Sequence, residues 1–154
     1  MALKTGDKIP DLTLPATGGK DISLKSYKGK KLVVYFYPKD NTPGCTQEGI
    51  DLRDLRKDFQ KAGAEIVGLS RDSVKSHENF TAKFDLNFPL LADTDEKACK
   101  AFDVIKEKSL YGKKYLGVDR STFLFDAAGV LRQEWRGVKV KGHAVEVLVA
   151  VKAL

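Results

Sequence analysis

The sequence predicts an α/β fold in which a mixed central sheet is flanked by helices. Residues 31–37 read KLVVYFY, and such an uninterrupted apolar run is typical of a strand that is buried on both faces of a sheet. Downstream, patterns with the period of an amphipathic helix alternate with short apolar runs, and the chain closes with two adjacent strand patterns and a last helix. Strand, helix and strand in succession favour parallel pairing through a right-handed crossover, whereas the late hairpin adds antiparallel strands. The sheet is therefore expected to be mixed.

The first 30 residues predict a β-hairpin ahead of the central strand. Apolar and polar residues alternate in 11–15 and 21–24, and the segment between them contains Thr17-Gly18-Gly19, which is typical of a turn. We expect this N-terminal hairpin to cover an edge of the sheet.

Turn and capping signals place the remaining elements. Pro43-Gly44 separates the central strand from a helix that Ala62-Gly63 ends, and Asp72-Ser73 and Asp93-Thr94-Asp95 cap two later helices. Residues 106–119 are predicted to form a polar loop. Strands are expected at 65–70, 88–91, 121–125 and 130–136, and helices at 45–61, at 73–84, around Cys99 and Phe102, and from Gly142 onward.

Length and composition exclude several classes of protein. A chain of 154 residues is expected to fold as a single domain over 1–154, and its two cysteines and two histidines provide neither a disulfide framework nor a zinc-type cluster. No segment resembles a signal peptide or a membrane span, so the expected location is the reducing cytoplasm. The net charge is +6, but the lysines are scattered among acidic residues, so we expect no nucleic-acid partner. We also expect no metal and no cofactor.

Cys45 stands out because of its position. It follows the break after the central strand and lies in the first turn of the predicted helix. Unpaired backbone N–H groups and the positive end of the helix dipole favour an anion there, so this thiol is expected to ionise more readily than a free one. A small buried apolar residue is the alternative interpretation of a lone cysteine.

The residues around Cys45 form a recognisable motif. Pro38, Thr42 and Cys45 have the spacing Pro-x-x-x-Thr-x-x-Cys within the run 36–48, FYPKDNTPGCTQE. This run resembles the active-site signature of the peroxiredoxins, and is most similar to their bacterioferritin comigratory protein, or Q-type, branch. The similarity extends over nearly the whole chain, with further matches at Gly6-Asp7, Leu14-Pro15, Phe88-Pro89-Leu90-Leu91 and Arg120-Ser121-Thr122-Phe123-Leu124.

The resemblance implies a thioredoxin-like fold with the N-terminal hairpin as an extension, and a thiol-dependent peroxidase. It implies that Cys45 attacks hydrogen peroxide or organic hydroperoxides, that the Thr42 hydroxyl binds the peroxide, and that Pro38 shields the pocket from water. Arg120 matches the late arginine of the family, which stabilises charge on the sulfur and on the oxygen under attack. Taken singly, Pro38 could be strand punctuation, Thr42 a helix cap and Arg120 a surface cation. Glu48 also matches the branch, but an acidic residue in a first helical turn explains it equally well, so it is not placed in the catalytic set.

The chain departs from many relatives in its second thiol. The position five residues after Cys45 is Ile50, and the helix at 73–84 contains no cysteine, which leaves Cys99 on a separate helix. We therefore expect a one-cysteine cycle, in which thioredoxin, glutaredoxin or glutathione regenerates the thiol and the chain works as a monomer in antioxidant defence. Cys99 as resolving cysteine is the alternative, and a thioredoxin-like binding or chaperone module without turnover is a second one. His77 and His143 are interpreted as helix-surface residues.

Overall fold

The computed structural model describes residues 3–154 and is built around one seven-stranded sheet, in the order β2-β1-β5-β4-β3-β8-β9. β3 (Lys31–Phe36) lies near its centre and pairs in parallel with β4 (Ala64–Ser70) and antiparallel with β8 (Ser121–Phe125). β4 pairs in parallel with β5 (Leu90–Ala92), and β8 pairs antiparallel with β9 (Leu131–Trp135). The mixed α/β sheet predicted from the sequence is confirmed.

The N-terminal hairpin is also confirmed. β1 (Thr13–Ala16) pairs antiparallel with β2 (Lys20–Ser23), and Gly18 and Gly19 turn the chain with φ of 87° and 70°. Ala16 pairs with Leu91 of β5, so the hairpin extends the sheet at that edge, as expected.

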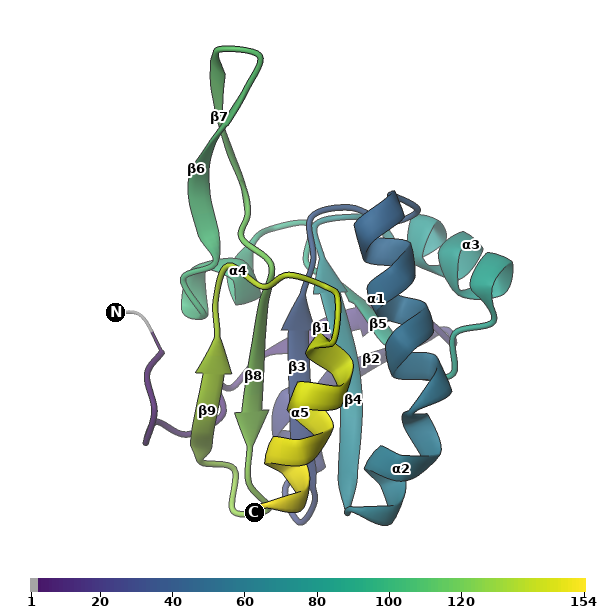
Figure 1. The fold of residues 1–154 in the computed structure, drawn as a ribbon, viewed down its shortest axis with the longest axis vertical. Coiled ribbons are helices and arrows are strands. Elements are labelled where there is room, and N and C mark those ends of the chain that lie inside the picture. The colour runs from purple at the N-terminus through teal and green to yellow at the C-terminus, as the bar shows by residue number, and fades with distance from the viewer. Residues whose placement is uncertain (1–2) are drawn as a thin grey trace.

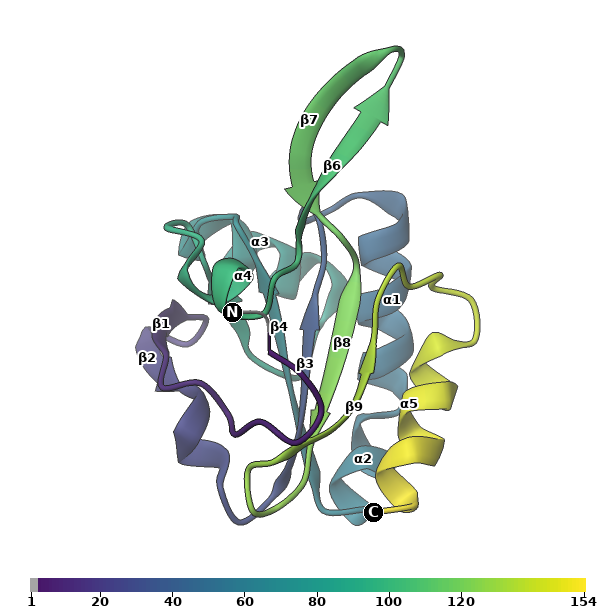
Figure 2. The same cartoon turned by 90° about the vertical axis from the view of Figure 1, so that its left-hand side faces the viewer.

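Helices cover both faces of the sheet. α1 (Pro43–Asp54), α2 (Arg56–Lys61) and α5 (His143–Lys152) lie on one face, whereas α4 (Lys97–Ala101) and the 3₁₀ turn η1 (Leu24–Tyr27) lie on the other (Figures 1 and 2). α3 (Val74–Phe84) packs near β5 and contributes Phe80 to the same core as α1 and α5. The side chains of β3 alternate between these two cores, which explains its unbroken apolar sequence.

The helix predicted at 45–61 is in fact two helices. The backbone leaves the α-helical path at Leu55, with φ −95° and ψ 2°, and α2 begins at the next residue. This turn lets Phe59 bury completely in a core that also contains Ala64 and Ile66 of β4. No glycine or proline marks the break, so sequence punctuation could not predict it.

The prediction of a polar loop at 106–119 is wrong. These residues form a second, two-stranded sheet, in which β6 (Ile105–Leu110) pairs antiparallel with β7 (Lys113–Val118). Tyr111 and Gly112 connect the strands, and both have positive φ, 52° and 77°, as the tightest hairpin turns require. This hairpin projects away from the rest of the molecule (Figures 1 and 2).

His143 was expected to lie on the surface of its helix, and this expectation is wrong. The residue is buried at the start of α5. Its Nε2 lies 2.8 Å from Oγ1 of Thr122 on β8, and its Nδ1 lies 3.0 Å from Oε1 of Glu146. Burial lowers the pKa of this imidazole, and Glu146 offsets only part of that effect. The contact with Thr122 thus attaches the start of α5 to β8 of the sheet.

Candidate active site

The central strand aims Cys45 at one end of the sheet. β3 ends at Phe36, and the chain then loops back through residues 37–42 into α1. Thr42 occupies the N-cap position with extended φ and ψ, and Pro43 takes the first helical position, where its missing N–H costs no hydrogen bond. Cys45 is therefore in the first turn of α1, where it is only 2% exposed. The sequence-based placement of this residue is confirmed.

Arg120 reaches Cys45 from a different part of the chain. It lies directly before β8, whose first residue, Ser121, pairs with Phe36 at the end of β3. Its Nη2 donates to Sγ of Cys45 at 3.4 Å, and its Nη1 donates to Oε1 of Glu48 at 2.7 Å. The alternative of Arg120 as a surface cation does not hold, because only 15% of its side chain is exposed.

Gly44 makes room for this guanidinium group. A Cβ at position 44 would lie 3.2 Å from Nη2 of Arg120, which is tighter than an ordinary contact. The absence of a side chain thus allows Arg120 to lie across the start of α1 and face both Cys45 and Glu48.

Glu48 belongs to this group of side chains, although sequence reasoning left it out. It is three residues after Cys45, so both side chains lie on the same face of α1. Glu48 is 2% exposed, and its Oε2 has no hydrogen-bond partner among residues 3–154. Burial raises its pKa from 4.5 to about 7, because the cost of desolvation exceeds the attraction of Arg120. The three-residue spacing was the signal that could have placed it in the site.

Thr42 and Pro38 lie in the same loop, but neither is joined to Cys45 by a hydrogen bond within the described chain. The Thr42 hydroxyl donates to the Lys39 carbonyl at 2.9 Å, and it makes no capping bond to α1. Pro38 is half-buried directly after Tyr37. The structure therefore brings together Cys45 and Arg120 of the four predicted site residues, and it places Thr42 and Pro38 on the loop beside them.

A buried carboxylate fastens this loop to α3. Asp40 accepts hydrogen bonds from the Tyr37 hydroxyl and, at 2.8 Å, from the Ser76 hydroxyl, and its backbone N–H donates to Oδ2 of Asp72 at 2.9 Å. Burial alone raises the pKa of Asp40. The hydrogen bonds from His77, Tyr37 and Ser76 outweigh that effect, so its pKa lies below the usual value.

His77 is the partner of Asp40, and its prediction as a surface residue is wrong, since it is completely buried. Its Nδ1 lies 2.7 Å from Oδ2 of Asp40, and its Nε2 lies 2.9 Å from the Leu91 carbonyl oxygen. Both ring nitrogens therefore face oxygen atoms, one on the Asp40 carboxylate and one on the Leu91 backbone.

Asp40, His77 and Asp72 offer ligand atoms within 4.8 Å of one another, a spacing that could hold a metal ion. Their polar atoms already serve hydrogen bonds to each other, to the Ser70 and Ser76 hydroxyls and to the backbone. These bonds account for the cluster without an ion.

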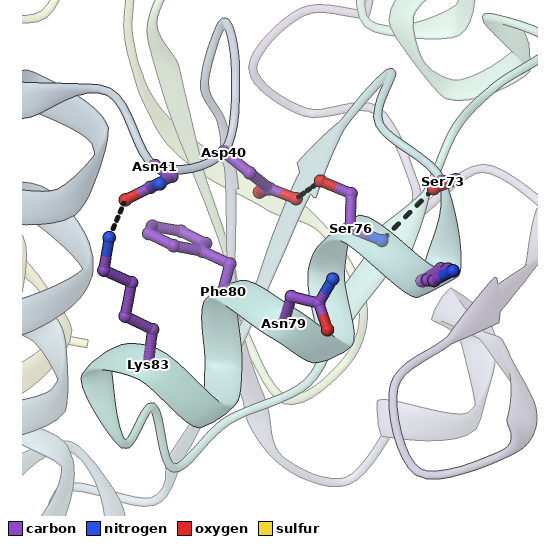
Figure 3. A pocket seen from close by; sticks show the side chains of 8 residues that line it. Asp40, Asn41, Ser73, Ser76, Asn79, Phe80 and Lys83 are labelled. Atoms are coloured by element: carbon purple, nitrogen blue, oxygen red, sulfur yellow. Dashed lines mark hydrogen bonds between the residues drawn. The ribbon is translucent and has the colours of Figure 1, made fainter.

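A polar cavity of about 400 Å³ lies between the loop and α3. Figure 3 shows Asp40 and Asn41 on the loop side and Phe80 and Lys83 on α3, with Lys83 Nζ donating to Oδ1 of Asn41 at 3.3 Å. The loop that precedes Cys45 is therefore attached to α3 at two points. Buried Asp40 contacts Ser76, and exposed Asn41 contacts Lys83.

Cys99 lies on the opposite face of the sheet from Cys45. It packs in the core that contains Phe36, Phe102 and Phe123, whereas Cys45 packs in the core with Tyr35 and Tyr37. Burial and the neighbouring Asp93 carboxylate raise the pKa of the Cys99 thiol. Both cysteines are free thiols in this structure.

Comparison with known proteins agrees with this geometry. Residues 5–134 match the model of the AhpC/TSA family. The chain is 58% identical to Peroxiredoxin Bcp of Xanthomonas campestris, covering 93% of this chain and 89% of the relative. It is 49% identical to Peroxiredoxin Bcp of Bacillus subtilis, covering 99% and 97%.

The chain belongs to the AhpC/TSA family of peroxiredoxins. The crystal structure of a Xylella fastidiosa PrxQ variant superposes on this peroxiredoxin with a TM-score of 0.94 at 44% identity, covering 99% of this chain and 98% of the other. A Xanthomonas campestris bacterioferritin comigratory protein superposes with a TM-score of 0.89 at 57% identity, covering 93% and 91%. These findings confirm the thioredoxin-like fold, the Bcp or Q-type branch and the function as a thiol-dependent peroxidase.

Within residues 3–154 of this peroxiredoxin, no helix has the length and apolar character needed to cross a membrane.

Proposed function

We propose that Cys45 is the residue that reduces the peroxide. The observation that carries this proposal is the Arg120 guanidinium 3.4 Å from the buried sulfur, in the first turn of α1. The guanidinium group and the backbone N–H groups at the start of α1 both attract negative charge at the position of this sulfur. The substrates are hydrogen peroxide and organic hydroperoxides. The study of the related Xanthomonas campestris protein concerns its alkyl peroxide reduction activity, which supports the second class.

The reaction follows from this arrangement. The Cys45 thiolate attacks the nearer peroxide oxygen, the O–O bond breaks, and the leaving oxygen takes a proton to become water or an alcohol. Cys45 is left as a sulfenic acid. Arg120 stabilises the negative charge as it moves from sulfur to the leaving oxygen, the Thr42 hydroxyl turns from the Lys39 carbonyl to bind the peroxide, and Pro38 keeps bulk water from the pocket.

Regeneration uses an external thiol. A thiol of thioredoxin, glutaredoxin or glutathione attacks the sulfenic acid sulfur, which forms a mixed disulfide and releases water, and a second thiol frees Cys45. The placement of Cys45 and Cys99 on opposite faces of the sheet supports this one-cysteine cycle over resolution by Cys99. A disulfide between them needs Cα atoms within about 7 Å, and the central strands lie between the two cores.

The test is the intact mass of the reduced chain after one equivalent of hydrogen peroxide, with and without a sulfenic-acid trap. We expect a trapped adduct on Cys45, none in Cys45→Ser, and full turnover with dithiothreitol in the matched control Cys99→Ser. A loss of two hydrogens without trapping would contradict the one-cysteine cycle. Unchanged peroxide consumption by folded Cys45→Ser would overturn the role of Cys45.

We further propose that the enzyme works as a monomer in the reducing cytoplasm. The resemblance to the Q-type branch supports the monomer, and the two unpaired thiols suit a reducing compartment. Sedimentation in the presence and absence of reductant tests the oligomeric state, and a dimer that persists in reductant would contradict it.

A further inference from the structure

The hairpin formed by β6 and β7, residues 105–118, is here called the arm. It carries four of the seven large apolar side chains that are exposed in residues 3–154, namely Leu110 (56%), Tyr111 (97%), Tyr115 (47%) and Leu116 (65%). The arm stands clear of the seven-stranded sheet, so no other element covers these side chains (Figures 1 and 2). Exposed apolar groups gathered on one projecting element indicate a contact surface.

The strand register shows which side chains of the arm lie on the same face. Lys108 pairs with Tyr115 and Leu110 pairs with Lys113, so these four side chains share one face. Lys108 and Tyr115 both lie beside Gly117, because Cδ of the lysine and Cε2 of the tyrosine are each 3.1 Å from the position of a Cβ there. One face of the arm thus joins two lysines to an aromatic ring and a leucine.

The arm is also strongly basic. It contains four lysines and one glutamate, a net charge of +3 on 14 residues, whereas the whole chain carries +6. Lys106 pairs with Asp103, and Lys114 pairs with Glu107 on the other face. Lys108 and Lys113 form no ion pair within the described residues, so the face with Tyr115 and Leu110 presents two uncompensated positive charges.

The base of the arm lies at the active site. β7 ends at Val118, two residues before Arg120, whose guanidinium group contacts Cys45. Asp119 N–H donates to the Val104 carbonyl at 2.7 Å, so both ends of the arm meet at this point. Figure 1 shows the arm rising from the same end of the sheet as the loop before α1.

We propose that the arm is the docking surface for the protein that reduces oxidised Cys45, and that this partner presents an acidic surface beside an apolar patch. The inference rests on the proposed one-cysteine cycle, in which an external thiol must reach the 2% exposed Cys45 sulfur. Opposite charge speeds the encounter, and contact with the arm holds the partner next to the site.

Charge also argues against two other occupants. The rest of the chain carries the remaining +3, so a second copy would bring like charges together. Two unpaired lysines beside leucine and tyrosine side chains suit a protein surface better than the continuous phosphate track of a nucleic acid, which calls for more cations.

The test compares two double charge reversals that change the net charge equally. Lys108→Glu/Lys113→Glu alters the arm, and Lys57→Glu/Lys61→Glu is the matched control on exposed positions of α2, which lies at the opposite end of the molecule in Figure 1. The probes are a thioredoxin and a glutaredoxin of negative net charge, and dithiothreitol as a small neutral dithiol. We expect kcat/KM for the protein reductant to fall about tenfold in the arm variant at low salt, and less at high salt. The control should change little, and dithiothreitol should support equal turnover in all three proteins.

Equal losses in the arm variant and the control would overturn the proposal, as would an unchanged kcat/KM in the arm variant. Turnover with dithiothreitol but with neither protein reductant would also overturn it. A salt-dependent DNA complex, or a dimer in sedimentation, that the arm variant abolishes would assign the arm to another partner. Absence of turnover with dithiothreitol in the wild-type protein would instead refute the proposed function, so the two failures are distinguishable.

Discussion

Replacing Glu48 with glutamine should change the pH dependence of stability in a defined way. Glu48 is buried, and its pKa rises from 4.5 in water to about 7 in the folded chain. Below about pH 4.5 the carboxyl group is protonated in both the folded and the unfolded chain, so it adds no pH dependence. Between pH 4.5 and 7 unfolding releases a proton, so the free energy of unfolding falls as the pH rises. Above pH 7 the full cost of the buried charge is present.

The size of this effect follows from the shift. Each pKa unit corresponds to about 1.4 kcal/mol, so the rise to about 7 amounts to about 3 kcal/mol of lost stability across this interval. Glutamine keeps the shape and an oxygen for Arg120 but cannot ionise. Its weaker hydrogen bond to Arg120 adds an offset that does not vary with pH, because arginine stays charged throughout.

The assay is urea denaturation at several values between pH 4.5 and 8.5, in a Cys45→Ser background so that thiol ionisation does not contribute. The difference in unfolding free energy between Glu48→Gln and its parent should shift in favour of glutamine by about 3 kcal/mol up to pH 7 and then remain constant. Asp58→Asn, at an exposed position of α2, serves as the control. A difference that stays the same at every pH would refute the reasoning that burial outweighs Arg120 at this carboxylate.

Two further predictions concern the same end of the sheet. Arg120→Lys should slow alkylation of Cys45 by iodoacetamide about tenfold at pH 7, because a single ammonium group cannot contact both Cys45 and Glu48 as the guanidinium group does. Equal alkylation rates in the variant and the wild-type protein would show that Arg120 does not activate the thiol. Asp40→Asn should lower the free energy of unfolding by about 3 kcal/mol, since it leaves the buried His77 without its carboxylate, and urea denaturation beside the exposed control Asp95→Asn measures this. A loss under about 0.5 kcal/mol would mean that the pair does not anchor the loop.

The sequence predicted the parts of this fold that local patterns encode. The apolar run of β3, the break at Pro43-Gly44 and the helix that follows placed Cys45 correctly, because each depends only on neighbouring residues. Arg120 was found through the resemblance to a family, since nothing near it in the chain indicates that it faces Cys45.

Features that depend on distant partners were missed. His77 was interpreted as exposed because helical periodicity cannot show that the Asp40 carboxylate contacts its ring. The arm was predicted to be a loop for two reasons. Apart from Gly117 and Val118 at its base, the arm is largely exposed, so its strands lack the alternation of apolar and polar residues. Tyr111-Gly112 is also not a typical pair for a tight hairpin turn. Glu48 could have been recognised by its helical spacing from Cys45, but its burial depends on the whole fold.

The separation of the two thiols has a consequence for motion during turnover. When a resolving cysteine belongs to the same chain but lies at a distance, a helix has to unfold locally in every cycle so that the two sulfur atoms can meet. Here Cys45 and Cys99 are divided by the sheet, and the proposed cycle makes no bond between them. α1 therefore does not have to carry Cys45 across the sheet to Cys99, and the motion that regeneration requires is a local opening that lets the external thiol reach the 2% exposed sulfur.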